Sequence, residues 1–128
     1  MERRDRSLKA IKELTYIDSL DSFEKADVLV LKLYEGVIKY LSFVKSAMQE
    51  ANVESKFNYI NKTIAIFDEL RNVLDFDGGE VAYYLDGLYL YQIETLFSAG
   101  IDDNINAVNQ VIKVTQGLID AWKEETGL

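Results

Sequence analysis

The side chains that most resemble a chemical site form two short acidic clusters. Asp75, Asp77 and Glu80 surround a Gly-Gly pair and faintly suggest a calcium loop. With Asp75 counted as the first ligand, Glu80 stands where a calcium loop requires glycine, so the match fails. The second cluster, Asp102 and Asp103, precedes a predicted helix, where acids favour the positive N-terminus. We therefore expect capping rather than metal binding or catalysis, with Asp77 as an N-cap and Glu80 three residues later.

Two residue types on which much enzyme chemistry depends are missing from the 128-residue chain, which has neither histidine nor cysteine. The lack of histidine removes the commonest general base and the commonest metal ligand. The lack of cysteine excludes disulfides, thiolate metal sites and a cysteine nucleophile. Catalysis by a buried lysine or carboxylate is left as the weakest alternative. We expect no enzyme activity, no cofactor and no metal.

The charge distribution bounds the partners and the location. Net charge is −8, but residues 1–12 carry +3, which leaves −11 on the remainder. Nucleic-acid binding requires clustered basic residues, so we expect none. No run of 18 apolar residues exists, so we expect no membrane span. The start is charged and lacks an apolar stretch, so we expect no signal peptide and a cytoplasmic location.

The apolar periodicity indicates an all-α protein with long helices. Four long helices are expected at 23–51, 54–75, 80–99 and 103–125. A shorter leading helix is expected at 4–18. No proline interrupts them, and Gly100 is the expected C-cap of the third long helix. Helices of this length joined by short breaks predict an antiparallel up-down four-helix bundle, with the leading helix as an N-terminal cap.

The leading segment, residues 1–20, is expected to be an arm attached to a bundle of residues 21–128. Its apolar residues at spacings near one helical turn are Leu8, Ile11, Leu14 and Ile17. An isolated helix of this length is marginal in water, so it needs a surface to pack on. Three possibilities stay open: docking on its own bundle, docking on a neighbouring molecule, and a frayed tail.

The helix expected at 80–99 carries more apolar residues than a bundle core needs. Of its 20 residues, 13 are apolar or aromatic, against roughly three in seven for a bundle helix. Four of the eight tyrosines lie here, at Tyr83, Tyr84, Tyr89 and Tyr91. A tyrosine has a large apolar body and a hydroxyl that tolerates water, which suits an intermittently covered surface, although plain packing explains it equally well. The surplus must be covered by the arm, a second subunit or a partner.

Four strings, in order along the chain, resemble the flagellar secretion chaperone family, FliS. They are Lys32-Leu33-Tyr34-Glu35-Gly36, the stretch from Leu74 to Ala82, the stretch from Tyr84 to Tyr91, and Gly117 to Trp122. The resemblance covers roughly residues 22–124. The positions that match the family signature, with roles in fold and turns, are Leu33, Gly36, Gly78, Gly79, Leu88, Tyr89 and Trp122. The chain departs from the family at Ser22-Phe23, where the family usually has Ser-Pro, and in an arm without tyrosine before Tyr16.

The resemblance implies a function in flagellar export. It implies a chaperone that binds the disordered C-terminal segment of flagellin in the cytoplasm, prevents premature polymerisation and aids delivery to the flagellar type III export apparatus. It implies no cofactor and no ATP hydrolysis, and a leading helix that occupies the client groove until flagellin displaces it. An export-gate component and a co-chaperone are further partners that it allows. Monomer and weak homodimer both stay open.

The partner-contact residues are predicted as apolar groups outside the narrowest core stripe. They are Tyr34, Ile64, Tyr83, Leu90 and Tyr91. A disordered client loses entropy when it becomes ordered, so we expect contact spread over many residues. The alternative to an export chaperone is a self-associating or regulator-binding bundle that uses the same surface.

Overall fold

The computed structural model describes residues 23–128, with side chains from Ala26 onward. Its elements are α2 (Phe23–Gln49), α3 (Val53–Asn72), the short 3₁₀ helix η1 (Phe76–Gly78), α4 (Glu80–Asp102) and α5 (Ile105–Thr126). Within these residues the four α-helices form a bundle and no strand occurs, which confirms the predicted all-α class. The predicted leading helix and its residues Leu8, Ile11, Leu14 and Ile17 lie outside the described residues.

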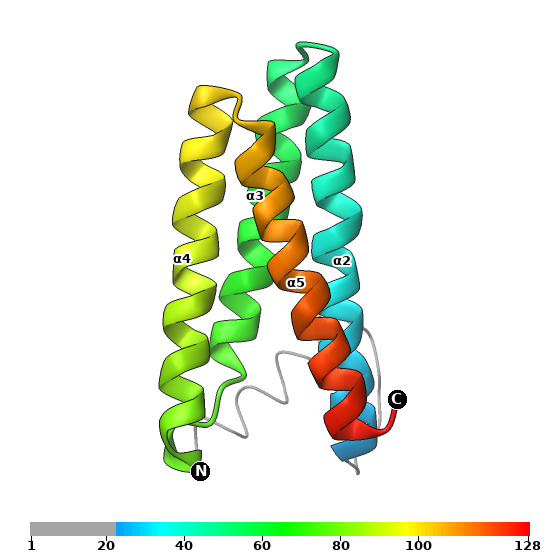
Figure 1. Ribbon diagram of the computed structural model, residues 1–128, viewed down its shortest axis with the longest axis vertical. Coiled ribbons are helices and arrows are strands. Elements are labelled where there is room, and N and C mark those ends of the chain that lie inside the picture. The colour runs from blue at the N-terminus through cyan, green and yellow to red at the C-terminus, as the bar shows by residue number, and fades with distance from the viewer. Residues whose placement is uncertain (1–22) are drawn as a thin grey trace.

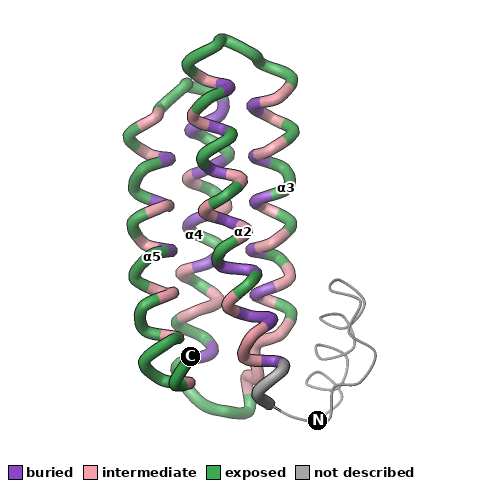
Figure 2. Tube along the Cα trace, turned by 90° about the vertical axis from the view of Figure 1, so that its right-hand side faces the viewer, coloured by how far each residue is buried: buried purple, intermediate pink, exposed green. Residues whose placement is uncertain are grey.

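The four helices form a ring in which each contacts two others. The contacting pairs are α2 with α3, α3 with α4, α4 with α5, and α5 with α2. Helix α2 is therefore diagonal to α4, and α3 is diagonal to α5 (Figure 1). Buried positions recur along every helix on the side that faces the other three (Figure 2). One continuous core results, so each helix keeps an outer side that no other described helix covers.

A left-handed residue followed by an asparagine closes the turn between α2 and α3. Ala51 has φ 55°, and the backbone N–H of Asn52 donates to the carbonyl of Ala47 at 2.8 Å. This is the helix-ending geometry in which one left-handed residue satisfies the last carbonyls. The Asn52 side chain then accepts a hydrogen bond from the Ser55 N–H at 3.1 Å and caps α3.

The turn between α4 and α5 repeats this arrangement. Asp103 has φ 52°, the N–H of Asn104 donates to the carbonyl of Ala99 at 3.0 Å, and the Asn104 side chain caps α5 by accepting from the Ala107 N–H. The prediction of Asp102 or Asp103 as the cap of α5 is therefore wrong. The local sequence is ambiguous because aspartate and asparagine are comparable N-caps, and the left-handed turn decides which one occupies the position.

Gly100 does not end α4, contrary to the prediction, because it lies inside the helix at its closest approach to α3. A Cβ added there would lie 2.7 Å from Ile60 Cδ1 and 2.9 Å from Phe57 Cε1. Gly100 is buried, and α4 continues to Asp102. The glycine is needed for a contact between helices that the sequence of α4 alone does not reveal.

Replacing Gly100 with alanine is expected to destabilise the fold by about 1–3 kcal/mol, because the new methyl group overpacks the contact with Ile60 and Phe57. The matched control is Gly117→Ala on α5, where an added Cβ meets nothing within 4 Å. That change is expected to stabilise by about 0.5–1 kcal/mol through helix propensity. Urea unfolding of both variants checks the pair. A stabilising Gly100→Ala would contradict the close approach.

The junction between α3 and α4 is built by a short 3₁₀ turn and a glycine. The Asp75 side chain accepts a hydrogen bond from the N–H of Asp77 at 3.1 Å and caps η1. Gly79 follows with φ +106° and ψ −157°, a conformation that favours glycine, and it is the N-cap of α4. Glu80 is thus the first residue of α4, and the prediction of Asp77 as its N-cap is wrong. The left-handed backbone at Gly79 starts the helix two residues later.

Two ion pairs join α3 to α4 near opposite ends. The Lys56 ammonium, on a side chain only 6% exposed, donates to Asp103 Oδ1 at 2.7 Å. Arg71 Nε donates to Asp86 Oδ1 at 2.9 Å. The start of α3 therefore lies beside the end of α4, and the end of α3 beside the start of α4. These paired ends fix the register of the two helices that build the candidate site.

Three of the family-signature residues, Leu33, Tyr89 and Trp122, lie in or against the core. Leu33 is buried, and Tyr89 is buried with its hydroxyl 2.6 Å from that of Tyr34. Trp122 packs against the core, with its ring edge-on to Tyr34 at 6.4 Å. Its Nε1–H donates to the carbonyl of Asp27 at 2.8 Å, which joins the end of α5 to the start of α2.

None of the described helices is long and apolar enough to cross a membrane. In residues 23–128, no three side chains of the types Asp, Glu, His and Cys are grouped to hold a metal ion.

Candidate partner-binding surface

Large apolar side chains gather on the outer side of α4. The exposed members, which we call the α4 face, are Val81, Tyr83, Tyr84, Leu90, Tyr91, Phe97 and Ile101. On the rest of the described chain the exposed large apolar residues are Phe43, Val53 and Leu128, which lie on other elements. A gathering of exposed apolar side chains on one element usually marks an interaction site.

Helical spacing divides most of the α4 face into two stripes. Tyr83, Leu90 and Phe97 recur every seven residues, which is about two turns, so they lie on one line along the helix. Tyr84 and Tyr91 have the same spacing on a second line about 100° round the helix, and the line between the two holds Gly87, Glu94 and Ile101. An extended or helical segment laid along α4 would meet one large side chain about every 10 Å.

The α4 face stays exposed because α3 and α5 cover only the inner side of α4. That inner side buries Ala82, Tyr89, Gln92, Leu96, Ala99 and Gly100. Helix α2 lies diagonally opposite and meets α4 across the core, through the Tyr34–Tyr89 pair. The surplus of apolar residues expected from the sequence is therefore on the surface, and the described part of the chain leaves it bare.

One stripe borders the seam between α3 and α4. Arg71 on α3 contacts Asp86 on α4, and Leu90 lies one turn beyond Asp86 on the same side. Ile64 lies two turns before Arg71 on α3, so it belongs to the same seam. Ile64 is partly buried against the core. At the other end of the stripe, the ring of Phe76 from η1 packs edge-on to Tyr83 with centroids 4.8 Å apart.

The charged residues of helix α4 are of one sign. Helix α4 carries Glu80, Asp86, Glu94 and Asp102 and no basic residue. Asp86 is compensated from α3 by Arg71, and this hydrogen bond raises the pKa of the Arg71 guanidinium. The remaining acids make the surroundings negative, so a basic or neutral apolar segment is favoured over an acidic one.

The structure brings four of the five predicted contact residues to one side of the bundle. Tyr83, Leu90 and Tyr91 are exposed on α4, and Ile64 lies at the α3–α4 seam. Tyr34 is 3% exposed and lies in the core, because its hydroxyl bonds to Tyr89 and its ring packs against Trp122. A contact between Tyr34 and a partner stays a prediction that this packing does not favour.

Burial governs the ionisation of the Tyr34–Tyr89 pair. It raises the pKa of both phenols, because the phenolate loses hydration in the core. The shared hydrogen bond lowers the pKa of Tyr34 in part, whereas the neighbouring Tyr34 raises that of Tyr89 further. Both hydroxyls are therefore neutral at physiological pH and serve the core rather than chemistry.

Sequence reasoning missed four residues of the α4 face: Val81, Tyr84, Phe97 and Ile101. For Phe97 a signal existed, since it continues the seven-residue spacing of Tyr83 and Leu90. Ile101 lies beyond the expected helix end at residue 99. Because Gly100 was predicted as the C-cap, Ile101 was not assigned to this helix. The sequence alone does not decide which side of α4 meets the core.

Comparison with known proteins gives a consistent set of relatives. The family model for the flagellar protein FliS matches residues 17–126. The flagellar secretion chaperone FliS of Campylobacter jejuni is 39% identical over 110 residues, which cover 85% of this chain and 86% of that protein. The chaperone of the same name from Vibrio cholerae is 30% identical over 92% of this chain and 87% of its own length. That of Escherichia coli is 33% identical, over 75% and 72% respectively.

Proposed function

Because this chain belongs to the FliS family of flagellar secretion chaperones, we propose that it binds the disordered C-terminal segment of flagellin. In this proposal it keeps flagellin from polymerising prematurely and aids its delivery to the flagellar type III export apparatus. The single observation that carries the proposal is the exposed α4 face, which has the apolar surface that such a client requires.

The composition of the α4 face supports a client that folds on binding. Tyr83 and Tyr91 are 66% and 65% exposed. Each offers a large ring to a partner and a hydroxyl to water when the partner is absent. Tyr83 also packs on Phe76, which extends the aromatic surface beyond α4. A disordered segment needs many modest contacts to offset its loss of entropy, and two long stripes provide them.

Residues 1–20 enter the proposal as a separable arm on the bundle of residues 21–128. The apolar residues Leu8, Ile11, Leu14 and Ile17 would cover the α4 face until the client displaces them. Charge supports this choice, because residues 1–12 carry +3 and α4 carries only acidic charged residues. These arm residues lie outside the described part of the chain.

The remaining parts of the proposal describe how the protein works. The up-down, antiparallel course of the bundle is supported by the paired ends of α3 and α4 and by the colour order along the helices (Figure 1). We propose action in the cytoplasm, without a cofactor and without catalysis, consistent with a chaperone family rather than an enzyme family. An export-gate component or a co-chaperone is the further partner.

Titration calorimetry with a peptide from the C-terminal segment of the cognate flagellin tests the proposal. Saturable binding with a negative heat-capacity change is the expected result, since apolar burial gives that sign. The double variant Tyr83→Ala/Phe97→Ala is expected to weaken binding about 30-fold or more, because large aromatic anchors dominate interface energies. Both side chains are exposed, so its thermal unfolding should stay close to that of the parent.

Phe43→Ala is the matched control, because Phe43 is an exposed aromatic residue on α2, which lies diagonal to α4. It should leave affinity within about twofold. No binding of the peptide, with residues 1–20 present or removed, would overturn the proposal. Equal losses from the control and the double variant would move the client away from α4.

The same α4 face supports the second candidate, a bundle that self-associates or binds another regulator. Two copies that shared their apolar faces would bury the same side chains. Sedimentation without flagellin distinguishes the two. A mass that rises with concentration, and that Tyr83→Ala/Phe97→Ala returns to the monomer value, would favour self-association.

A further inference from the structure

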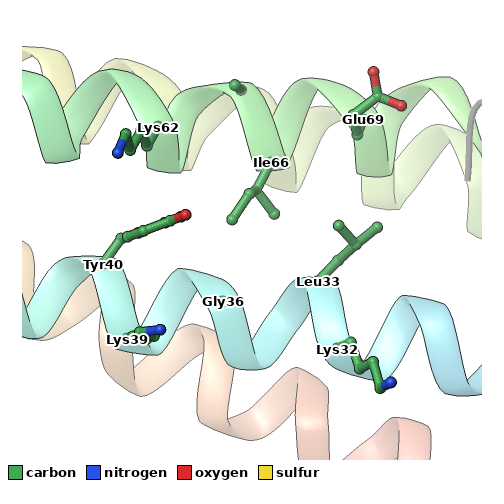
Figure 3. A pocket seen from close by; sticks show the side chains of 9 residues that line it. Lys32, Leu33, Gly36, Lys39, Tyr40, Lys62, Ile66 and Glu69 are labelled. Carbon is green, nitrogen blue, oxygen red and sulfur yellow. The ribbon is translucent and has the colours of Figure 1, made fainter. Parts of the chain in front are cut away.

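A second surface, different in character from the α4 face, lies between α2 and α3. It is a groove of about 530 Å³ (Figure 3). Its lining residues are Lys32, Leu33, Gly36, Lys39 and Tyr40 from α2, and Lys62, Ala65, Ile66 and Glu69 from α3. Helix α2 is diagonal to α4, so the groove opens on a different side of the bundle from the α4 face.

The floor of the groove is apolar, and Gly36 lets the two helices approach closely there. A Cβ added at Gly36 would lie 3.1 Å from Ile66 Cδ1, so the glycine allows Ile66 to pack against the backbone of α2. Leu33 and Ile66 line the floor beside the glycine, on facing helices (Figure 3). An apolar side chain of a partner would find contact on two sides here.

The rims of the groove are basic, although the chain as a whole carries −8. Lys32 and Lys39 lie on the α2 rim and are exposed, and Lys62 lies on the α3 rim. Cation–π contacts position the Lys62 ammonium, which lies 5.7 Å from the ring centre of Tyr40 and 5.4 Å from that of Tyr59. Three lysines and one acid, Glu69, line the groove, so it favours an acidic occupant.

Glu69 gives the groove a direction. It is the one acid among the nine lining residues, and it lies at the end of the groove away from Tyr40 (Figure 3). The first turn of a helix is the positive end of its dipole, so it is favoured beside a carboxylate. Lys39 and Lys62, at the Tyr40 end, would meet the negative end (Figure 3).

The length of the groove matches a short helix. Lys32 and Lys39 are seven residues apart on α2, and Lys62 and Glu69 are seven apart on α3. Seven residues correspond to two turns, or about 10 Å. An occupant with one apolar stripe of two to three turns, flanked by acids, would place its apolar residues on the floor and its carboxylates at the rims.

We propose that this groove is a docking site for an acidic amphipathic helix of a partner protein, with its N-terminus beside Glu69. The chain's own arm is the wrong occupant, because residues 1–12 carry +3 and would face three lysines. The inference goes beyond the proposed function: it rests on the lysines, Gly36 and Glu69, and it holds whichever partner covers the α4 face.

Two synthetic helical peptides test it directly. Both carry the same leucine stripe over three to four turns, flanked by glutamates in one and by lysines in the other. Fluorescence anisotropy of the labelled peptides on the full chain should give saturable binding for the glutamate peptide and at least about tenfold weaker binding for the lysine peptide. Raising the ionic strength from about 0.05 to about 0.5 M should weaken the first, because the Debye length shortens severalfold. Equal affinity for the two peptides would overturn the proposal.

Variants place the binding in the groove. Lys32→Glu/Lys39→Glu reverses two exposed rim charges and should weaken the glutamate peptide at least about tenfold. Lys113→Glu, an exposed lysine on α5, is the matched control and should change affinity less than about twofold. Ala65→Trp should block the floor without a change in charge and reduce affinity similarly. Unchanged affinity in the rim variant or in Ala65→Trp would overturn the assignment. It would also be overturned if a second copy of the chain displaced the peptide and this displacement were lost in the same variants.

Discussion

Replacing Phe67 with alanine is expected to lower the free energy of unfolding by about 3–5 kcal/mol, because the side chain is fully buried and leaves a cavity. The ring packs against Tyr89, with centroids 6.0 Å apart, at the centre of the core. Helix α3 and helix α4 both lose contacts there. Urea unfolding followed by the fluorescence of the single tryptophan, Trp122, measures the change.

The matched control uses the same residue type on the surface. Phe97 is 61% exposed on the α4 face, so Phe97→Ala is expected to change stability by no more than about 0.5 kcal/mol. The two variants remove the same ring and differ only in burial. Similar losses of unfolding free energy in both variants would mean that a segment outside residues 23–128 covers Phe97. The α4 face would then not be exposed.

Replacing Tyr89 with phenylalanine is expected to destabilise by about 1–3 kcal/mol, because it leaves the Tyr34 hydroxyl buried without its partner. Tyr34→Phe should cost a similar amount for the same reason. The double variant removes both hydroxyls and should cost less than the sum of the two single changes. Additive losses in this cycle would show that the 2.6 Å contact contributes no coupling.

The same pair predicts a loss of stability at alkaline pH. Burial holds the pKa of both phenols above the ordinary value of 10.0. Below that value both are neutral in the folded and the unfolded chain, so their contribution is fully present. As the pH rises past 10.0, the unfolded chain loses these protons first, and the free energy of unfolding falls by up to about 1.4 kcal/mol per pH unit for each phenol.

Unfolding midpoints measured from pH 8 upward check this sign. The Tyr34→Phe/Tyr89→Phe variant lacks both raised pKa values, so its stability should fall less steeply than that of the parent. Tyr84→Phe/Tyr91→Phe is the control, since both tyrosines are exposed on the α4 face. A parent as insensitive to alkali as the double core variant would contradict the link between burial and ionisation.

The fold was largely predictable because its signal is local. Four apolar periodicities separated by polar or glycine-containing breaks gave the number and order of the long helices, and the structure has them within three residues of the expected bounds. The errors lie where the chain turns. Ala51 and Asp103 adopt left-handed conformations that favour glycine, while Gly100 remains helical. The end of α4 depends on the contacts of Gly100 with α3, and the local sequence of α4 does not predict those contacts.

The candidate site was predictable in part. The four tyrosines on α4 were equally consistent with an exposed surface and with plain packing, and the structure divides them: Tyr83, Tyr84 and Tyr91 are exposed, whereas Tyr89 is buried. Tyr34 was assigned to the surface although the core contains it, because adjacent apolar lines on a helix differ by only a fraction of a turn. The groove was missed because it requires two helices. Lys39 and Lys62 come together only when the outer faces of α2 and α3 are aligned.

The hydrogen bond from Trp122 to Asp27 also has a consequence for the order of folding. It joins residues 95 apart in sequence, so the seam between α2 and α5 closes only after nearly the whole chain has been synthesised. The contacts of α3 with α2 and with α4 are closer in sequence and have a smaller loop-closure entropy. We expect a three-helix intermediate during synthesis, with α2 incompletely covered. The nascent chain would then be most exposed to proteases and to aggregation until its last helix leaves the ribosome.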